Sequence, residues 1–144
     1  MSFFKTLFTP SAAEDPADFW KLISSETDVE EALADSYGNK VVIFKHSTRC
    51  HISKRVLKNF EKQVKKSDKE AIYYFLDLLS YRSISDAIAE RLEVQHQSPQ
   101  MIVVENGIAV RNASHQNISL DILWYVENIS IFAKLFGGLA QLAS

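Results

Sequence analysis

The sequence predicts a mixed three-layer α/β sandwich, because buried strands alternate with amphipathic helices before a hairpin. The run 41–44 contains only β-branched and aromatic residues, which is typical of a strand buried on both faces of a parallel sheet. Between Ile52 and Val64 the apolar residues recur instead at helical spacing, with basic residues on the other face. Asn106-Gly107 is a strong two-residue hairpin signal, which adds an antiparallel pair to the sheet.

The predicted elements follow the order β-α-β-α-β-α-β-β-α. Strands are expected at 19–23 (an edge strand), 41–44, 72–79, 101–104 and 108–112. The first helix is expected to begin with a capping box of Thr27 and Glu30 and to end at Gly38. Later helices are expected after the loop 46–49, over 83–92 and from Ser119.

One domain is expected over residues 19–127, between two extensions. Residues 1–18 form an N-terminal extension that ends in an acidic, proline-containing linker. Residues 128–144 carry an apolar helical stripe, interrupted by Gly137-Gly138 and too short to cross a bilayer. This C-terminal helix is expected to pack on the domain or on a second copy of the chain, which would make a homodimer. A membrane surface is the less favoured alternative, because Lys134 is the only basic residue of the segment.

Composition argues for a cytoplasmic protein that does not bind nucleic acid. The net charge is −2, without the basic surplus of a nucleic-acid-binding domain. One cysteine allows no internal disulfide, which is typical of a reducing compartment. Neither a signal peptide nor a transmembrane segment is expected. The four histidines and the cysteine match no standard zinc spacing, so no metal site is expected.

Cys50 is the candidate catalytic residue. It follows the predicted buried strand and opens a helix, where unpaired N–H groups and the helix dipole favour a thiolate over a thiol. Arg49, together with Lys45 and His46, adds positive charge nearby in sequence. The alternative is an inert buried thiol, but Thr48, Arg49 and His51 are polar, whereas such a thiol usually lies in an apolar stripe.

Ser53 occupies the position of the second cysteine in a C-x-x-C pair. A hydroxyl forms no disulfide, so disulfide exchange at Cys50 would finish with an external thiol. Ser53 could also donate a hydrogen bond to the Cys50 thiolate from one helical turn away. The two residues together predict a monothiol mechanism.

The order of elements is similar to that of the thioredoxin fold. In that fold a cis proline before this strand stands against the active cysteine, and the backbone of the residue before it pairs with an incoming peptide. By analogy, Ser98-Pro99 is predicted to be cis, with the Ser98 backbone facing Cys50.

Three separated strings resemble the YtxJ family, the monothiol bacilliredoxins of the bacillithiol system. They are FKHSTRCHIS (44–53), YRSISDAIAERLEVQHQSPQ (81–100) and ASHQNIS (113–119), and the resemblance covers about 19–127. It implies that Cys50 attacks the mixed disulfide between bacillithiol and a client protein, and that a second thiol regenerates the enzyme. Bacillithiol, or a similar low-molecular-weight thiol, would be a co-substrate, and no cofactor is implied.

The resemblance also implies substrate-binding residues and shows a departure from the family. Ser98, Pro99, Gln100 and His115 are implied to contact substrate, and His96 is a further candidate. His51 stands where the family usually has proline, which leaves the nucleophile intact and alters its redox setting.

Two other functions are compatible with the sequence. The chain could be a redox-sensing or protein-binding module in which Cys50 is only modified. It could also be a scaffold assembled through its apolar terminal segments. Arg82 is either a ligand for a bacillithiol carboxylate or an exposed helix residue.

Overall fold

The central strand of the sheet is β2 (Val41–His46), and all six of its residues are buried. The structure is a computed structural model, and it describes residues 15–123. β2 pairs in parallel with β3 (Ile72–Asp77) and antiparallel with β4 (Gln100–Glu105). The predicted mixed sheet is therefore confirmed, and β2 extends two residues beyond the predicted strand.

The five strands lie in the order β1-β3-β2-β4-β5. β1 (Trp20–Leu22) is the predicted edge strand, parallel to β3, and β5 (Ile108–Ser114) closes the other edge, antiparallel to β4. The predicted hairpin joins β4 to β5, and Asn106 and Gly107 both have positive φ, as a two-residue type I′ turn requires.

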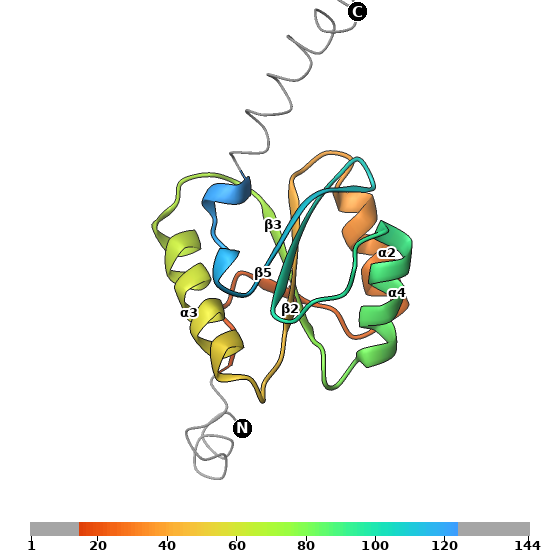
Figure 1. The fold of residues 1–144 in the computed structure, drawn as a ribbon. Helices are drawn as coiled ribbons and strands as arrows, with labels where there is room; N and C mark the ends of the chain where they lie inside the picture. Colours follow the sequence, from red (N-terminus) through yellow and green to blue (C-terminus); the bar gives the residue numbers. More distant parts are fainter. Residues whose placement is uncertain (1–14, 124–144) are drawn as a thin grey trace, which may run out of the picture.

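Helices cover both faces of this sheet, which makes the predicted three layers (Figure 1). α3 (His51–Lys66) lies on one face, and α2 (Glu26–Asp35) and α4 (Arg82–Leu92) lie on the other. The side chains of β2 alternate between the two apolar clusters: Val42 and Phe44 pack on the α3 side, and Val41 and Ile43 on the opposite side. Both faces of β2 are thus core.

Two predicted limits of α2 are wrong. The helix begins after Ser25, whose extended backbone and hydroxyl, accepting from the Asp28 N–H at 3.2 Å, form the N-cap. Thr27 therefore lies inside the helix and forms no capping box with Glu30. The helix ends at Asp35, and residues 36–38, which were expected to complete the helix, form a turn instead.

α3 holds both ends of the described chain. The Glu61 carboxylate accepts hydrogen bonds from the Ala17 N–H at 2.8 Å and from the Trp20 indole at 2.7 Å. The Gln63 side-chain carbonyl accepts from the Leu120 N–H at 2.7 Å. Ala17 thus already belongs to the folded domain, two residues before its predicted start.

Several predictions fall outside residues 15–123. They concern most of the N-terminal extension, the whole 128–144 extension, and the greater part of the helix expected from Ser119. Among the helices of the described part, none is long and apolar enough to cross a membrane.

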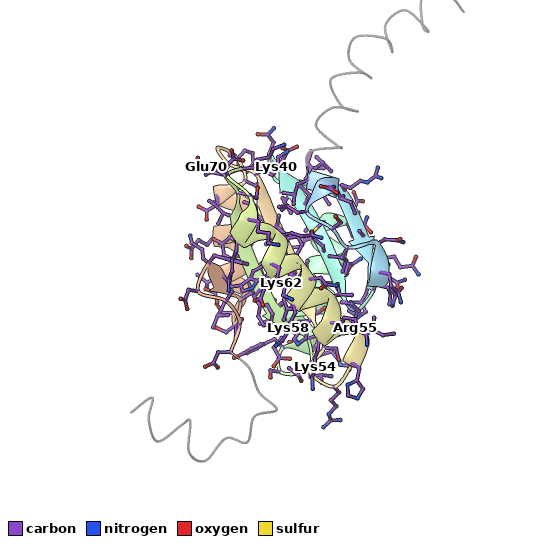
Figure 2. The ribbon with its side chains drawn as sticks, turned by 90° about the vertical axis from the view of Figure 1, so that its left-hand side faces the viewer. Lys40, Lys54, Arg55, Lys58, Lys62 and Glu70 are labelled. Carbon is purple, nitrogen blue, oxygen red and sulfur yellow. The ribbon has the colours of Figure 1, made fainter. Side chains whose placement is uncertain are left out.

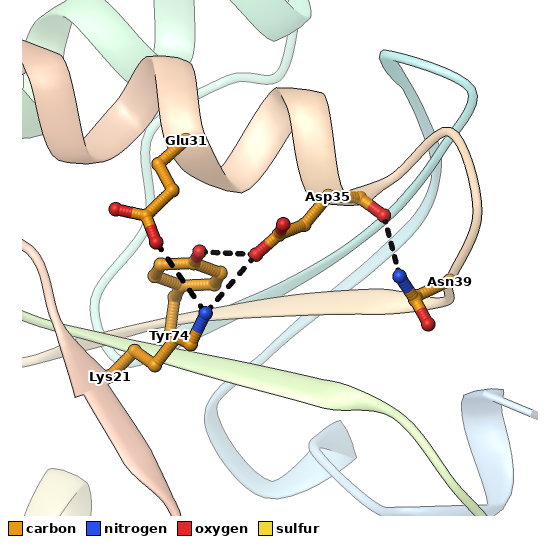
Figure 3. Close-up of polar contacts among 5 residues, drawn as sticks. All are labelled: Lys21, Glu31, Asp35, Asn39 and Tyr74. Atoms are coloured by element: carbon orange, nitrogen blue, oxygen red, sulfur yellow. Dashed lines mark hydrogen bonds and ion pairs between the residues drawn. The ribbon is translucent and has the colours of Figure 1, made fainter.

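A polar cluster joins β1, α2 and β3 at one edge of the sheet (Figure 3). The Tyr74 hydroxyl donates to Asp35 at 2.6 Å, and Lys21 lies 3.3 Å from the same carboxylate. The hydrogen bond from Tyr74 lowers the pKa of Asp35, and burial opposes this in part. The ionised form of Asp35 is therefore favoured by the fold.

Tyr74→Phe is expected to destabilise the protein by about 1.5–3 kcal/mol, because it removes a hydrogen bond to a charged group. Tyr73→Phe is the matched control, since the Tyr73 hydroxyl is buried without a hydrogen-bond partner in the described part of the chain. Its loss should be neutral or stabilising. Urea unfolding of both variants checks this, and equal costs would contradict it.

Candidate active site

Cys50 is the N-cap residue of α3. Its backbone is extended (φ −100°, ψ 119°), and its N–H donates to the Ser47 carbonyl at 3.2 Å across the turn after β2. Its own carbonyl accepts from the Lys54 N–H at 3.1 Å, the first hydrogen bond of the helix. The predicted placement of Cys50 at a helix N-terminus is confirmed.

The thiol is partly exposed and belongs to neither buried apolar cluster. Its side chain makes no capping hydrogen bond to α3. Thr48, Arg49 and His51 are exposed around it. The inert-thiol alternative therefore finds no support, while the supporting roles of these three neighbours stay predictions.

The Ser53 side chain points away from solvent, and its hydroxyl contacts His46 and the backbone of Ser47. Ser53 is completely buried, accepts a hydrogen bond from the Ser47 N–H at 3.0 Å, and lies 2.8 Å from Nδ1 of His46. The expected hydrogen bond to the Cys50 thiolate is thus replaced by contacts with the turn and with β2. Ser53 fastens the turn that carries Cys50 to the central strand.

His46 is the buried partner of Ser53 on the α3 face of the sheet. Burial lowers the pKa of His46, and Asp77 on the neighbouring strand opposes this in part. A neutral imidazole either accepts from the Ser53 hydroxyl or donates to it, depending on the tautomer. The sequence suggested positive charge from His46, whereas burial favours the neutral ring.

Lys45 also departs from the expected role, because it points to the opposite face of the sheet. It is completely buried, and its ammonium donates to the Ser85 carbonyl of α4 at 3.0 Å and lies 3.3 Å from Nδ1 of His96. Burial lowers the pKa of Lys45 to about 8, with a smaller opposing effect of Asp86. Lys45 therefore braces α4 and His96 and adds no charge on the α3 side.

The Ser98-Pro99 peptide bond is cis, as predicted. β2 and β4 are antiparallel, with Lys45 opposite Gln100, so the last residues of β2 and the first residues of β4 lie at the same end of the sheet. Cys50 follows the first of these and Pro99 precedes the second. A contact between the Ser98 backbone and Cys50 stays a prediction.

His115 is brought to the same end of the sheet. It begins η1 (His115–Asn117), a short 3₁₀ helix that the sequence pattern did not predict, and its N–H donates to the Pro99 carbonyl at 3.1 Å. Its φ of 56° turns the chain there. The structure thus joins two of the implied substrate-binding residues through their backbones.

Gln100 does not reach the surface. Its side chain is completely buried, where the amide donates to the Gln95 carbonyl at 2.9 Å and accepts from the Gln97 N–H at 3.4 Å. These bonds hold the segment that leads to Pro99. The geometry thus gives Gln100 a positioning role instead of the implied contact with substrate.

Sequence reasoning missed the pairing of His46 with Ser53 and the burial of Lys45. The available signal was the strand itself, because extending it by two residues places Lys45 and His46 on opposite faces of a buried sheet. Within residues 15–123, no group of three or more histidine, cysteine or acidic residues could hold a metal ion.

Comparisons with known proteins agree with this geometry. The family described as monothiol bacilliredoxin BrxC matches residues 21–123. A solved structure described as a putative oxidoreductase with a thioredoxin fold is 31% identical, with a TM-score of 0.64 over 74% of this chain and 91% of that chain.

Two thioredoxins share the fold at lower identity. The thioredoxin of Malassezia sympodialis is 16% identical, with a TM-score of 0.60 over 81% of this chain and 95% of that chain. The thioredoxin of Fasciola hepatica is 14% identical, with a TM-score of 0.57 over 75% of this chain and 97% of that chain. The predicted thioredoxin-like fold is therefore confirmed.

The lowered pKa of His46 predicts a loss of stability in mild acid. An unfolded histidine binds a proton near pH ~6.5, whereas the folded protein resists protonation of His46, so falling pH favours unfolding until the folded pKa is reached. His46→Asn replaces the imidazole by an amide, which can hydrogen-bond with Ser53 but cannot titrate. Urea unfolding at pH ~7 and at pH ~5 measures the free energy of unfolding of both proteins. It should fall more for the wild type than for His46→Asn, and equal losses would refute this role of His46.

Proposed function

Since this chain belongs to the monothiol bacilliredoxin BrxC family and is a thiol oxidoreductase with the thioredoxin fold, we propose that its Cys50 removes bacillithiol from mixed disulfides of client proteins. The observation that carries the proposal is the pair formed by Cys50 and Ser53. Cys50 is a partly exposed helix N-cap, and a buried hydroxyl follows one turn later.

The first step is the attack of the Cys50 thiolate on the bacillithiol sulfur of the mixed disulfide. The disulfide bond breaks, and the client sulfur leaves with the bonding electrons and takes up a proton. Bacillithiol is now joined to Cys50 in a new disulfide, so the oxidation level is conserved. Cys50 attacks from its position at the N-terminus of α3.

The second step needs an external thiol, because Cys50 is the only cysteine of the sequence. A second bacillithiol thiolate attacks the bacillithiol sulfur on Cys50, and Cys50 leaves as a thiolate. The products are free enzyme and oxidised bacillithiol. The net reaction transfers the disulfide from the client to two bacillithiol molecules.

In this proposal, the client binds at the end of the sheet that lies next to the Cys50 thiol. The exposed residues Thr48, Arg49 and His51 flank Cys50 in the sequence, and the backbone at Ser98-Pro99 lies at the same end of the sheet. A single cysteine and the bacillithiol chemistry both fit a reducing cytoplasm, which we propose as the location.

Cys50→Ser is expected to abolish the release of bacillithiol from a modified client peptide. The measurement is the rate of peptide thiol release with excess bacillithiol, for wild type and variant. Mass spectrometry of the wild type after oxidised bacillithiol or oxidised glutathione identifies the adduct on Cys50. If neither oxidised thiol forms an adduct on Cys50, the proposal is refuted. If an adduct forms but the client thiol is not released, a redox-sensing module is favoured.

Ser53→Cys is expected to change the second step. A thiol at this buried position can attack the Cys50 disulfide from one helical turn away and expel bacillithiol without a second thiol. Mass spectrometry should show loss of the adduct and the formation of an internal disulfide. Ser53→Ala is the control and should keep the adduct, and an adduct that persists in Ser53→Cys would contradict the expected geometry.

A further inference from the structure

A small pocket lies between the helix that carries Cys50 and the 3₁₀ helix η1. Its volume is about 160 Å³. It is lined by six residues, Ile52, Arg55, Val56, Asn59, Gln116 and Ile118. Nothing in the proposed reaction steps uses this pocket.

Both walls of the pocket are formed by residues that follow candidate site residues in the sequence. Ile52 lies two residues after Cys50 on the first turn of α3, and Arg55 and Asn59 continue the same helix face at spacings of three and four. Gln116 directly follows His115, whose N–H binds the Pro99 carbonyl. The pocket therefore extends along α3 from the second residue after Cys50 and lies between this helix and the segment that follows His115.

The lining suits an anionic group with polar substituents. Val56 and Ile118 are buried and form an apolar base, while Arg55, Asn59 and Gln116 are exposed. Within residues 15–123, the Arg55 guanidinium has no ion pair or hydrogen bond with another side chain. A guanidinium presents paired N–H donors that match a carboxylate.

The surrounding charge favours the same class of ligand. The outer face of α3 is basic along its length, and its first turn has no acidic residue. Figure 2 shows four cations of this helix, which are Lys54, Arg55, Lys58 and Lys62. An anion approaching this side of the molecule is attracted towards α3.

The size of the pocket limits what it can hold. Pockets for whole ligands usually measure about 300–1,000 Å³, so this one accommodates only part of a low-molecular-weight thiol. We propose that it binds the carboxylate-bearing end of the thiol joined to Cys50, with Arg55 pairing with the carboxylate and Asn59 and Gln116 binding neighbouring polar groups. This inference rests on the proposed function and names the part of the substrate that gives specificity.

The test compares Arg55→Gln with Lys62→Gln. Both variants remove one positive charge from the exposed face of α3, but only Arg55 lines the pocket. The substrates are one client peptide carrying bacillithiol, glutathione or 2-mercaptoethanol as a mixed disulfide. The first two thiols carry carboxylates, and the third is neutral.

Arg55→Gln is expected to lower kcat/KM by about 10- to 100-fold for a carboxylate-bearing thiol, as for loss of a charged hydrogen bond, and to leave the 2-mercaptoethanol reaction unchanged. Lys62→Gln should affect all three substrates alike and weakly. Loss with bacillithiol alone, glutathione alone or both identifies the source of the carboxylate. Gln116→Ala should reproduce the same selectivity to a smaller extent.

Two outcomes would overturn the pocket assignment. An equal loss for all three substrates would mean that Arg55 acts on Cys50 in general, and an unchanged rate would mean that it binds no carboxylate. Wild-type protein that is inactive on every substrate would instead refute the proposed function. Thermal unfolding of each variant verifies that it is folded.

Discussion

The burial of β2 on both faces is the constraint on which the rest of the structure depends. Each of its residues must face either the α3 side or the side of α2 and α4, so the strand determines the position of both helical layers. It also carries its last two residues, Lys45 and His46, into the interior. The turn after it then has little freedom in where it places Cys50.

Buried polar side chains connect the end of β2 to both helical layers. On one face, His46 and Ser53 connect the end of β2 to the first turn of α3. On the other face, Lys45 connects the same strand end to α4 and to His96. These buried polar groups have hydrogen-bond partners, so they can orient this end of the sheet without leaving unsatisfied polar atoms in the core. The two sides of the site are thus held by groups that are not themselves exposed.

Patterns that repeat along the chain predicted most of the fold. The alternation of strands and helices, the Asn106-Gly107 turn and the place of Cys50 all follow from local sequence, and the structure confirms them. The start of α2 was misplaced because Ser25 and Thr27 are both good caps, and the choice between them depends on packing. The family resemblance implied that Gln100 contacts substrate, whereas its side chain is turned inward at the start of β4. Such orientation depends on contacts between distant segments, which no local pattern contains.

The hydrogen bonds of Glu61 and Gln63 have a consequence for how the domain opens. They attach the first described residues and the segment after η1 to the middle of one helix. Fraying of either end of the described part therefore has to break a contact with α3, and unwinding of α3 at these residues releases both of these ends at once. The two ends and the middle of the cysteine-bearing helix should behave as one cooperative unit, whose backbone amides exchange with solvent together.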